Sequence, residues 1–259
     1  MKVVILCGGF GSRIRDVSET IPKPMIPIGG RPILWHIMKY YASHGFKEFI
    51  LCLGYKKEVI TDFFHSYRSH MQDSTVVLGR GGEPRYHGAP DGADWTVTLA
   101  DTGQNALTGA RVRRIRKYVA DDENFMLTYG DGVGDVALDR LLAFHQSHGK
   151  ILTVTGVRPP GRFGEIVARA DGMVTEFNEK PQATAGRISG GFFVCRRELF
   201  DYLDDREALV FEQDPMNRLV ADGQMALFEH DGFWQPMDTS REYEYLNAIY
   251  LAGKAPWIR

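Results

Sequence analysis

The chain has 259 residues, with 31 Lys and Arg against 33 Asp and Glu, so its formal net charge is −2. Hydrophobic residues make up 44% and charged residues 25% of the sequence, an ordinary composition for a globular protein. The near-neutral balance argues against binding to nucleic acid or to an anionic membrane surface. The longest apolar runs are strand-sized, far short of the roughly 20 residues that a membrane-spanning helix needs. We therefore expect a cytoplasmic protein that binds neither nucleic acid nor membrane.

The first part of the chain alternates strand patterns with helix patterns. Such alternation predicts an α/β fold, in which a mostly parallel (mixed) sheet carries helices on both faces. Pro32 suits the first turn of one predicted helix, and Gly45 lies just beyond its end. The predicted strands are residues 2–7, 48–53, 75–78, 95–99, 124–128 and 151–157, and the predicted helices are 32–44, 56–67, 110–119 and 138–147.

The sequence pattern changes after Pro159 and Pro160, where short strand patterns alternate with turn residues. We find no repeat, no low-complexity tract and no linker, which favours a single domain over residues 1–259. The glycine-rich stretch 79–94 is predicted to be a loop. The later predicted strands are residues 165–168, 173–177, 191–195 and 225–229, and the later predicted helices are 215–222 and 240–252.

A glycine-rich turn, residues 7–13 (CGGFGSR), follows the first strand directly. Glycines allow a close approach of the backbone to an anion, and Arg13 adds a forked cationic partner, so the turn is a candidate phosphate cradle. The turn is neither a dinucleotide-binding fingerprint nor a P-loop, because Ile14 replaces the third glycine and no Gly-Lys-Ser/Thr follows. A tight turn with an exposed arginine is the alternative interpretation.

A lysine between two prolines, Pro22-Lys23-Pro24, comes shortly after this turn. The prolines restrict the backbone, so the ammonium group of Lys23 could be held in place as a point charge between two phosphates. The alternative is a surface turn with a solvated lysine.

Two carboxylates are candidate ligands for a metal ion. Asp131 lies between two glycines directly after a predicted buried strand, where a carboxylate has room for hydrated Mg²⁺. Asp238 lies just before the last predicted helix, and its alternative role is to cap that helix, which Thr239 or Ser240 could also do.

A third candidate site is Glu179-Lys180, at the end of a predicted strand. A carboxylate can accept hydrogen bonds from sugar hydroxyls while an ammonium binds phosphate; the alternative is a surface ion pair of little weight. The eight histidines show no ligand spacing for a transition metal.

Taken in order, these segments resemble the sugar-1-phosphate nucleotidyltransferases, whose signature is GGxGTR followed by PKPM. Within that family the whole chain is similar to the glucose-1-phosphate cytidylyltransferase branch. The segments that carry the branch resemblance are GGRPILWHIMKYY, ASHGFKEFILCLGYK, LADTG, LTGARVRRI, FMLTYGDGV, PPGRFGEI, EKP, GGFFV, GFWQPMDT and GKAPW.

The resemblance implies a Rossmann-like fold and conversion of CTP and glucose 1-phosphate to CDP-glucose and pyrophosphate, with Mg²⁺ as cofactor. It also implies a homo-oligomer, with a hexamer suggested. The aromatic residues near the C-terminus fit that expectation, because a solvated tail needs fewer of them: Tyr243, Tyr245, Tyr250 and Trp257. Residues 1–157 would bind the nucleotide and 158–259 the sugar. The implied catalytic residues are Arg13, Lys23 and Asp131, and the implied metal ligands are Asp131 and Asp238. The implied nucleotide-binding residues are Leu6, Gly8, Gly9, Gly11, Ser12, Arg13, Lys23, Thr108, Gly109, Arg111 and Gly130. The implied sugar-phosphate-binding residues are Gly164, Glu179, Lys180 and Gly191.

Two departures from the branch concern the sugar and one loop. Ser189 stands where we expect Asn beside the sugar, and residues 79–94 match the branch poorly. Alternatives that remain open are a uridylyl- or thymidylyltransferase acting on another sugar 1-phosphate and a non-catalytic nucleotide-sugar sensor. An NAD-dependent dehydrogenase is disfavoured by the missing fingerprint and by the Pro-Lys-Pro segment.

Overall fold

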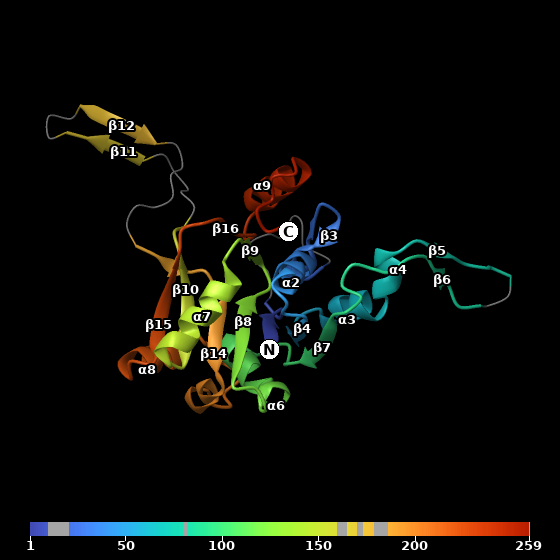
Figure 1. Cartoon of the computed structure of the whole chain (residues 1–259), viewed down its shortest axis with the longest axis horizontal. Coiled ribbons are helices and arrows are strands. Elements are labelled where there is room, and N and C mark those ends of the chain that lie inside the picture. Colours follow the sequence, from blue (N-terminus) through green and yellow to red (C-terminus); the bar gives the residue numbers. More distant parts are fainter. Residues whose placement is uncertain (10–20, 80–81, 160–164, 170–172, 179–185, 259) are drawn as a thin grey trace.

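The computed structural model describes residues 1–9, 21–79, 82–159, 165–169, 173–178 and 186–258. Its centre is a mixed sheet of eight strands, counted over these residues, with neighbours in the order β13-β10-β14-β8-β1-β4-β7 and with β15 on the other edge of β10 (Figure 1). Strands β13 and β14 run antiparallel to their neighbours, and the other pairs are parallel. The predicted mostly parallel sheet is therefore confirmed. The strands are β1 Lys2–Leu6, β4 Glu48–Leu53, β7 Thr96–Asp101, β8 Asn124–Tyr129, β10 Leu152–Val157, β13 Ile188–Ser189, β14 Phe193–Arg196 and β15 Met225–His230.

Strand β1 shows why the central strands are continuously apolar. Val3 and Ile5 belong to a hydrophobic cluster on one face of the sheet, while Val4 and Leu6 belong to a second cluster on the other face. Both faces are covered by helices, as the alternating pattern predicts. On the first face lie α2 Ile33–Ser43, α3 Lys57–His65, α7 Leu138–His148 and α9 Ser240–Leu251; on the second lie α5 Thr108–Arg114, α6 Arg116–Val119, η2 Arg197–Tyr202 and α8 Asp214–Ala221.

Several short elements lie outside the central sheet, and residues 75–78 depart from the predicted pattern. Residues 75–78 are not one strand: Ser74–Thr75 (β5) pairs with Arg85–Tyr86 (β6), and Val76, Val77 and Leu78 are exposed at the end of a projecting arm (Figure 1). β11 Glu165–Ala168 and β12 Val174–Asn178 form their own hairpin. The remaining elements are η1 Lys23–Met25, β2 Pro27–Ile28, β3 Arg31–Pro32, α4 Tyr67–Met71, β9 Gly132–Gly134 and β16 Trp234–Pro236.

The end of the described chain packs into the first hydrophobic cluster through Trp257, whose side chain is fully buried. The Nε1–H of Trp257 donates to Nδ1 of His36 at 3.3 Å, and Nε2 of His36 lies 2.8 Å from the carbonyl oxygen of Ile28, to which it must donate. Both ring nitrogens are thereby assigned, and the imidazole is neutral. Burial lowers the pKa of His36 to about 4, although the Ile28 carbonyl favours the charged form. No helix in the described ranges is both long and apolar enough to cross a membrane.

The depressed pKa of His36 predicts loss of stability on mild acidification. As the pH falls below 6.5 the unfolded chain binds a proton that the folded chain does not bind until about pH 4, so acidification between these values lowers the free energy of the unfolded state relative to the folded state. We expect this site to remove about 2 kcal/mol of unfolding free energy between pH 7 and pH 5. The measurement is urea unfolding of wild type and His36→Gln at both pH values. The variant, less stable at pH 7, should lose less on acidification.

The control for this experiment is His65→Gln, because His65 is an exposed histidine on α3. It should keep the pH dependence of the wild type. An unchanged pH dependence in His36→Gln would contradict the assignment of a neutral imidazole.

Candidate active site

Lys23 joins the two candidate metal ligands. Its Nζ donates to Oδ2 of Asp131 at 2.6 Å and also to Oδ1 of Asp238. The lysine side chain is only 12% exposed, which excludes the solvated surface turn. Three segments that lie far apart in the sequence thus place one cation and two carboxylates at a single point, at the carboxyl end of β8.

The neighbouring ribbon explains how Asp238 reaches Asp131. Strands β9 and β16 pair antiparallel, with Pro236 opposite Gly132, and they connect the end of β8 to the start of α9. Beyond the ribbon, the backbone N–H of Met237 donates to the carbonyl oxygen of Asp131 at 2.8 Å. The two aspartates are therefore adjacent because the ribbon's register makes them so.

Asp238 is available because another residue caps α9. Thr239 is the N-cap and forms a capping box with Glu242, whose carboxylate accepts from the backbone N–H groups of Thr239 (2.9 Å) and Asp238 (2.7 Å). The capping role considered for Asp238 is therefore wrong, and its carboxylate points to Lys23 instead.

The electrostatics of this cluster favour a cation. Burial by itself lowers the pKa of Lys23, but the carboxylates of Asp131 and Asp238 outweigh that effect and raise the pKa above its ordinary value. The lysine stays protonated, and two carboxylates against one ammonium leave a net charge of −1. Carboxylate oxygens are the ligands that Mg²⁺ prefers, and one or two of them are enough for it. No group of three or more His, Cys, Asp or Glu side chains suited to a metal occurs among the described residues.

Gly130 allows the backbone segments of the site to meet. A Cβ atom there would lie 2.8 Å from the carbonyl oxygen of Leu6 and 3.2 Å from the ring of Pro24. The backbone N–H of Gly130 also donates to the Leu6 carbonyl at 3.0 Å. The end of β1, the Pro-Lys-Pro segment and the end of β8 are consequently packed against one another, and only glycine fits.

Arg111 lies directly beneath the start of the glycine-rich turn. A Cβ atom on Gly8 would fall 2.1 Å from the guanidinium carbon of Arg111, whereas a Cβ atom on the exposed Gly9 would meet no described atom within 4 Å. The Nη2 atom donates to the carbonyl oxygens of Gly8 (2.8 Å) and Gln104 (3.3 Å). The Nη1 atom donates to the carbonyl oxygens of Leu53 and Gly103 and to Oγ1 of Thr102, at 2.8–3.0 Å.

The guanidinium group of Arg111 is a buried charge held by neutral partners. Arg111 is 4% exposed, and none of the ion pairs among the described residues includes it. Burial is the main cause that lowers the pKa of Arg111, yet arginine remains protonated at any physiological pH. Arg111 therefore ties the ends of β1, β4 and β7 together and adds positive potential under the turn, without reaching its surface.

Thr108 and Gly109 are held by a segment that precedes α8. The Thr108 hydroxyl donates to Glu212 at 2.6 Å and accepts from the backbone N–H of Phe211 at 2.9 Å, and the N–H of Gly109 donates to the Leu209 carbonyl. Glu212 also accepts from the Tyr129 hydroxyl at 2.5 Å. Our sequence analysis missed Glu212; its only sequence signal is the acidic pair in FEQD, which has no distinctive spacing.

Gly191 fits closely against the same region. Its φ is +75°, and a Cβ atom there would lie 2.9 Å from the ring of Tyr129, so any side chain would be strained and would clash. Six of the predicted site residues lie outside the described residues: Gly11, Ser12, Arg13, Gly164, Glu179 and Lys180.

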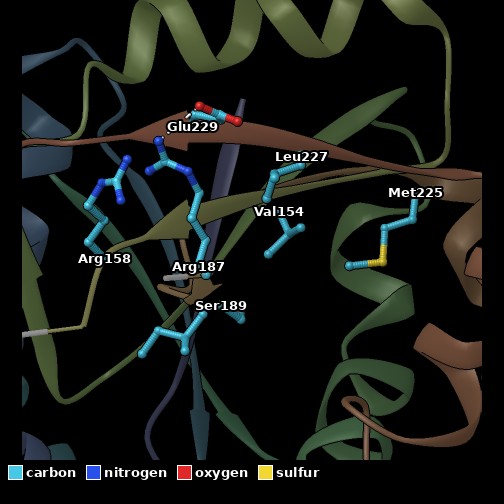
Figure 2. Close-up of a pocket in the computed structure, with 9 residues that line it drawn as sticks. Val154, Arg158, Arg187, Ser189, Met225, Leu227 and Glu229 are labelled. Carbon is cyan, nitrogen blue, oxygen red and sulfur yellow. Dashed lines mark hydrogen bonds and ion pairs between the residues drawn. The ribbon is translucent and has the colours of Figure 1, made fainter. Parts of the chain in front are cut away.

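A surface cleft of about 610 Å³ lies beside the sheet at β10, β13 and β15. Figure 2 shows Arg158, Arg187 and Glu229 close together at one end of it, with Val154 and Leu227 next to them and Met225 at the other end. None of Lys23, Asp131 and Asp238 lines this cleft. The charged cluster at the end of β8, and not this cleft, is the candidate active site.

Comparisons with known proteins identify the family of the chain. The family model for nucleotidyl transferases matches residues 2–251. The chain belongs to the nucleotidyl transferase family.

Relatives of higher sequence identity indicate which branch of the family this chain resembles. The chain is 47% identical over 257 residues to the glucose-1-phosphate cytidylyltransferase of Salmonella typhimurium, covering 99% of this chain and 98% of that protein. It is 41% identical to a probable glucose-1-phosphate cytidylyltransferase of Bacillus subtilis, with 99% of both chains covered. The branch resemblance noted in the sequence is thereby confirmed.

Solved structures confirm the fold. HddC from Yersinia pseudotuberculosis superposes with a TM-score of 0.67 at 22% identity, covering 96% of this chain and 99% of that chain. A putative glucose-1-phosphate thymidylyltransferase from Bacillus anthracis gives the same TM-score at 16% identity, with 96% and 94% covered.

The contacts of Arg111 predict that even a conservative substitution lowers the unfolding free energy substantially. In Arg111→Lys a single ammonium cannot reach five acceptors that two guanidinium nitrogens share, so buried carbonyl groups lose their partners. We expect the unfolding free energy to fall by about 2 kcal/mol or more, measured by urea unfolding.

Arg113→Lys is the matched control, because Arg113 lies on the same helix and pairs with Asp205, which is 86% exposed. Its effect should stay within about 0.5 kcal/mol. Equal stabilities of the two variants would show that Arg111 does not hold the strand ends together.

Proposed function

We propose that the protein transfers the cytidylyl group of CTP to glucose 1-phosphate, giving CDP-glucose and pyrophosphate. The observation that carries the proposal is the contact of Lys23 with both Asp131 and Asp238. The relatives named above support the choice of CTP and glucose 1-phosphate, because they match this chain over almost its full length. A sensor that only binds nucleotide sugars has less need of two paired carboxylates beside a lysine.

The reaction needs positioning and charge neutralisation more than it needs a protein nucleophile. A phosphate oxygen of glucose 1-phosphate forms a new bond to the α-phosphorus of CTP. The bond from that phosphorus to the oxygen that bridges to the β-phosphate breaks, and pyrophosphate leaves with the electron pair. The phosphate groups of the two substrates carry most of the negative charge in this step. Cations near these groups therefore contribute most to lowering the activation barrier.

In this proposal Lys23 and the glycine-rich turn bind the triphosphate of CTP. The ammonium group of Lys23 is protonated and restricted by its neighbouring prolines, so it can contact phosphate oxygens without first losing much conformational freedom. The backbone of Leu6, Gly8, Gly9 and Gly130 lies at the same carboxyl end of the sheet. We assign Gly11, Ser12 and Arg13 to the triphosphate as well, because they belong to the same glycine-rich stretch of the sequence. Arg111 donates a hydrogen bond to the carbonyl oxygen of Gly8 and adds positive potential behind the start of the glycine-rich turn.

The carboxylates of Asp131 and Asp238 would hold Mg²⁺, whose donor preference they satisfy. When bound, such an ion neutralises charge that develops on the phosphate oxygens. The contact that both carboxylates make to one ammonium supports this assignment, because it places their oxygens around a single cationic point.

The remaining residues are assigned to the base and the sugar. Thr108 and Gly109 lie beside the nucleotide base, held by the segment that contains Glu212. Gly164, Glu179, Lys180 and Gly191 bind glucose 1-phosphate, with Lys180 on its phosphate. In this division residues 1–157 serve the nucleotide and residues 158–259 serve the sugar.

We also propose a homo-oligomer. The aromatic residues near the C-terminus no longer support it strongly, because Trp257 is buried in the core and Tyr250 packs against His36. Its better support is the exposed run Val76, Val77 and Leu78 on the projecting arm, of which Leu78 is 93% exposed. Light scattering tests this; a strict monomer at micromolar concentration would exclude it.

The test of the function is a pyrophosphate-release assay that crosses CTP, UTP, dTTP, GTP and ATP with the 1-phosphates of glucose, mannose and galactose. We expect the highest kcat/KM for CTP with glucose 1-phosphate and no turnover with excess chelator. Preference for UTP or dTTP would replace the cytidylyltransferase by the uridylyl- or thymidylyltransferase alternative. Absence of turnover with all pairs would favour the sensor.

Asp131→Asn and Asp238→Asn should each lower kcat at least about a hundredfold, about 3 kcal/mol, because each removes charge that is needed most in the transition state. The measurement is steady-state kinetics at several Mg²⁺ concentrations. Asp139→Asn is the control, since Asp139 is 75% exposed on the first turn of α7. Wild-type kcat with unchanged Mg²⁺ dependence in Asp131→Asn would refute the metal assignment.

A further inference from the structure

The pairing of β10 with the chain that follows it across the sheet is interrupted. Strand β10 pairs through residues 156–157 with β13 and through residues 152–153 with residues 194–195 of β14. Between these pairs β10 has two residues, 154–155, whereas the opposite chain has four, 190–193. The opposite chain therefore carries two extra residues, which form a bulge. We call residues 190–193 the β13–β14 bulge.

The backbone of this bulge adopts a conformation that most residues avoid. Gly191 has a φ of +75° and Phe192 has a φ of +48°. Glycine adopts positive φ without strain, but a bulky aromatic residue does not. A strained residue of this kind persists only where its surroundings impose the conformation, and such residues cluster at functional sites. The bulge therefore needs specific neighbours that hold it.

Thr155, which lies on β10 opposite the bulge, contacts three of its residues. The Thr155 side chain is fully buried, and its Oγ1 donates to the carbonyl oxygen of Phe192 at 2.8 Å. The backbone N–H of Gly190 donates to the Thr155 carbonyl at 2.9 Å, and the N–H of Thr155 donates to the Gly191 carbonyl at 3.4 Å. Since the single N–H of Thr155 is directed to Gly191, the hydroxyl supplies the donor for Phe192.

The bulge lies next to the end of β8, where the candidate active site begins. Phe193 pairs with Leu127 in the middle of β8. Further along the two chains, a Cβ atom on Gly191 would lie 2.9 Å from the ring of Tyr129, the last residue of β8. Asp131, which contacts Lys23, follows two residues later. The position of the Gly191 backbone relative to this site therefore depends on the bulge.

Two aromatic side chains fix the bulge from other directions. The ring of Phe192 stacks on that of Tyr41 in the first hydrophobic cluster, with 5.8 Å between the ring centres. The Nε1–H of Trp234, on β16, donates to the carbonyl oxygen of Gly190 at 2.8 Å. Neither contact involves the Phe192 carbonyl, so the role of the Thr155 hydroxyl is distinct from theirs.

We propose that Thr155 is a positioning residue for glucose 1-phosphate. Its hydroxyl holds Phe192 in the strained conformation and thereby fixes the backbone of Gly191. The inference rests on the proposed function, in which Gly191 binds the sugar phosphate. Thr155 is buried beneath the bulge and does not contact the reacting atoms; it reduces the backbone freedom that the bulge must lose when the substrate binds.

The test compares two substitutions of Thr155 by steady-state kinetics and by hydrogen exchange of the full chain. Thr155→Val keeps the shape of the side chain but removes the hydroxyl, whereas Thr155→Ser keeps the hydroxyl. We expect Thr155→Val to raise the KM for glucose 1-phosphate about fivefold, as for one lost hydrogen bond, and to leave the KM for CTP within about twofold of the wild-type value. Exchange in residues 190–193 should become faster. Thr155→Ser should restore both quantities to near the wild-type values.

Thr153→Val is the matched control, because Thr153 is also fully buried on β10 and its Oγ1 lies 2.8 Å from Nδ1 of His145 and 2.9 Å from Nε2 of His148. The same substitution there removes the contacts of another buried hydroxyl, so a general loss of stability would appear in both variants. We expect no change in the KM for glucose 1-phosphate or in the exchange of residues 190–193.

Three kinetic outcomes would overturn the proposal: a wild-type KM for glucose 1-phosphate in Thr155→Val, equal rises in both KM values, or the same rise in Thr153→Val. Absence of pyrophosphate release by the wild type would instead refute the proposed function. Unchanged exchange in Thr155→Val, beside normal turnover of the wild type, would refute the role of Thr155 alone.

Discussion

The arrangement of the site depends on one ammonium group placed between two carboxylates. Asp131 and Asp238 would repel each other without a cation, and Lys23 supplies that cation in the described structure. Because the lysine is mostly buried, its charge is screened less than a surface charge would be. In the proposed function the same three groups supply a positive charge for phosphate and two oxygen ligands for a divalent cation.

The cations near the site differ in how they act. Lys23 lies at the carboxyl end of the sheet and pairs with two carboxylates, whereas Arg111 is enclosed and its partners among the described residues are backbone carbonyls and the Thr102 hydroxyl. The buried guanidinium fixes the shape of the turn at Gly8. One cation is thus paired with two carboxylates, and the other is held by neutral oxygen atoms.

The central sheet and the small β9–β16 ribbon each position part of the candidate site. Parallel strands bring Leu6 and Tyr129 to the same edge, which is the usual location of ligand sites in α/β folds. The ribbon then brings Asp238 to this edge, beside Lys23.

The sequence by itself determined the strand and helix alternation, because strands buried on both faces must be continuously apolar and helices must be amphipathic. It also indicated Lys23 and Asp131, whose chemistry depends on adjacent prolines and glycines. Only the tertiary structure decided that Thr239 and not Asp238 caps α9, that Arg111 is enclosed, and that Glu212 and Thr155 join distant segments. Those outcomes depend on pairing register and side-chain contacts between residues far apart in the chain, which local patterns do not encode.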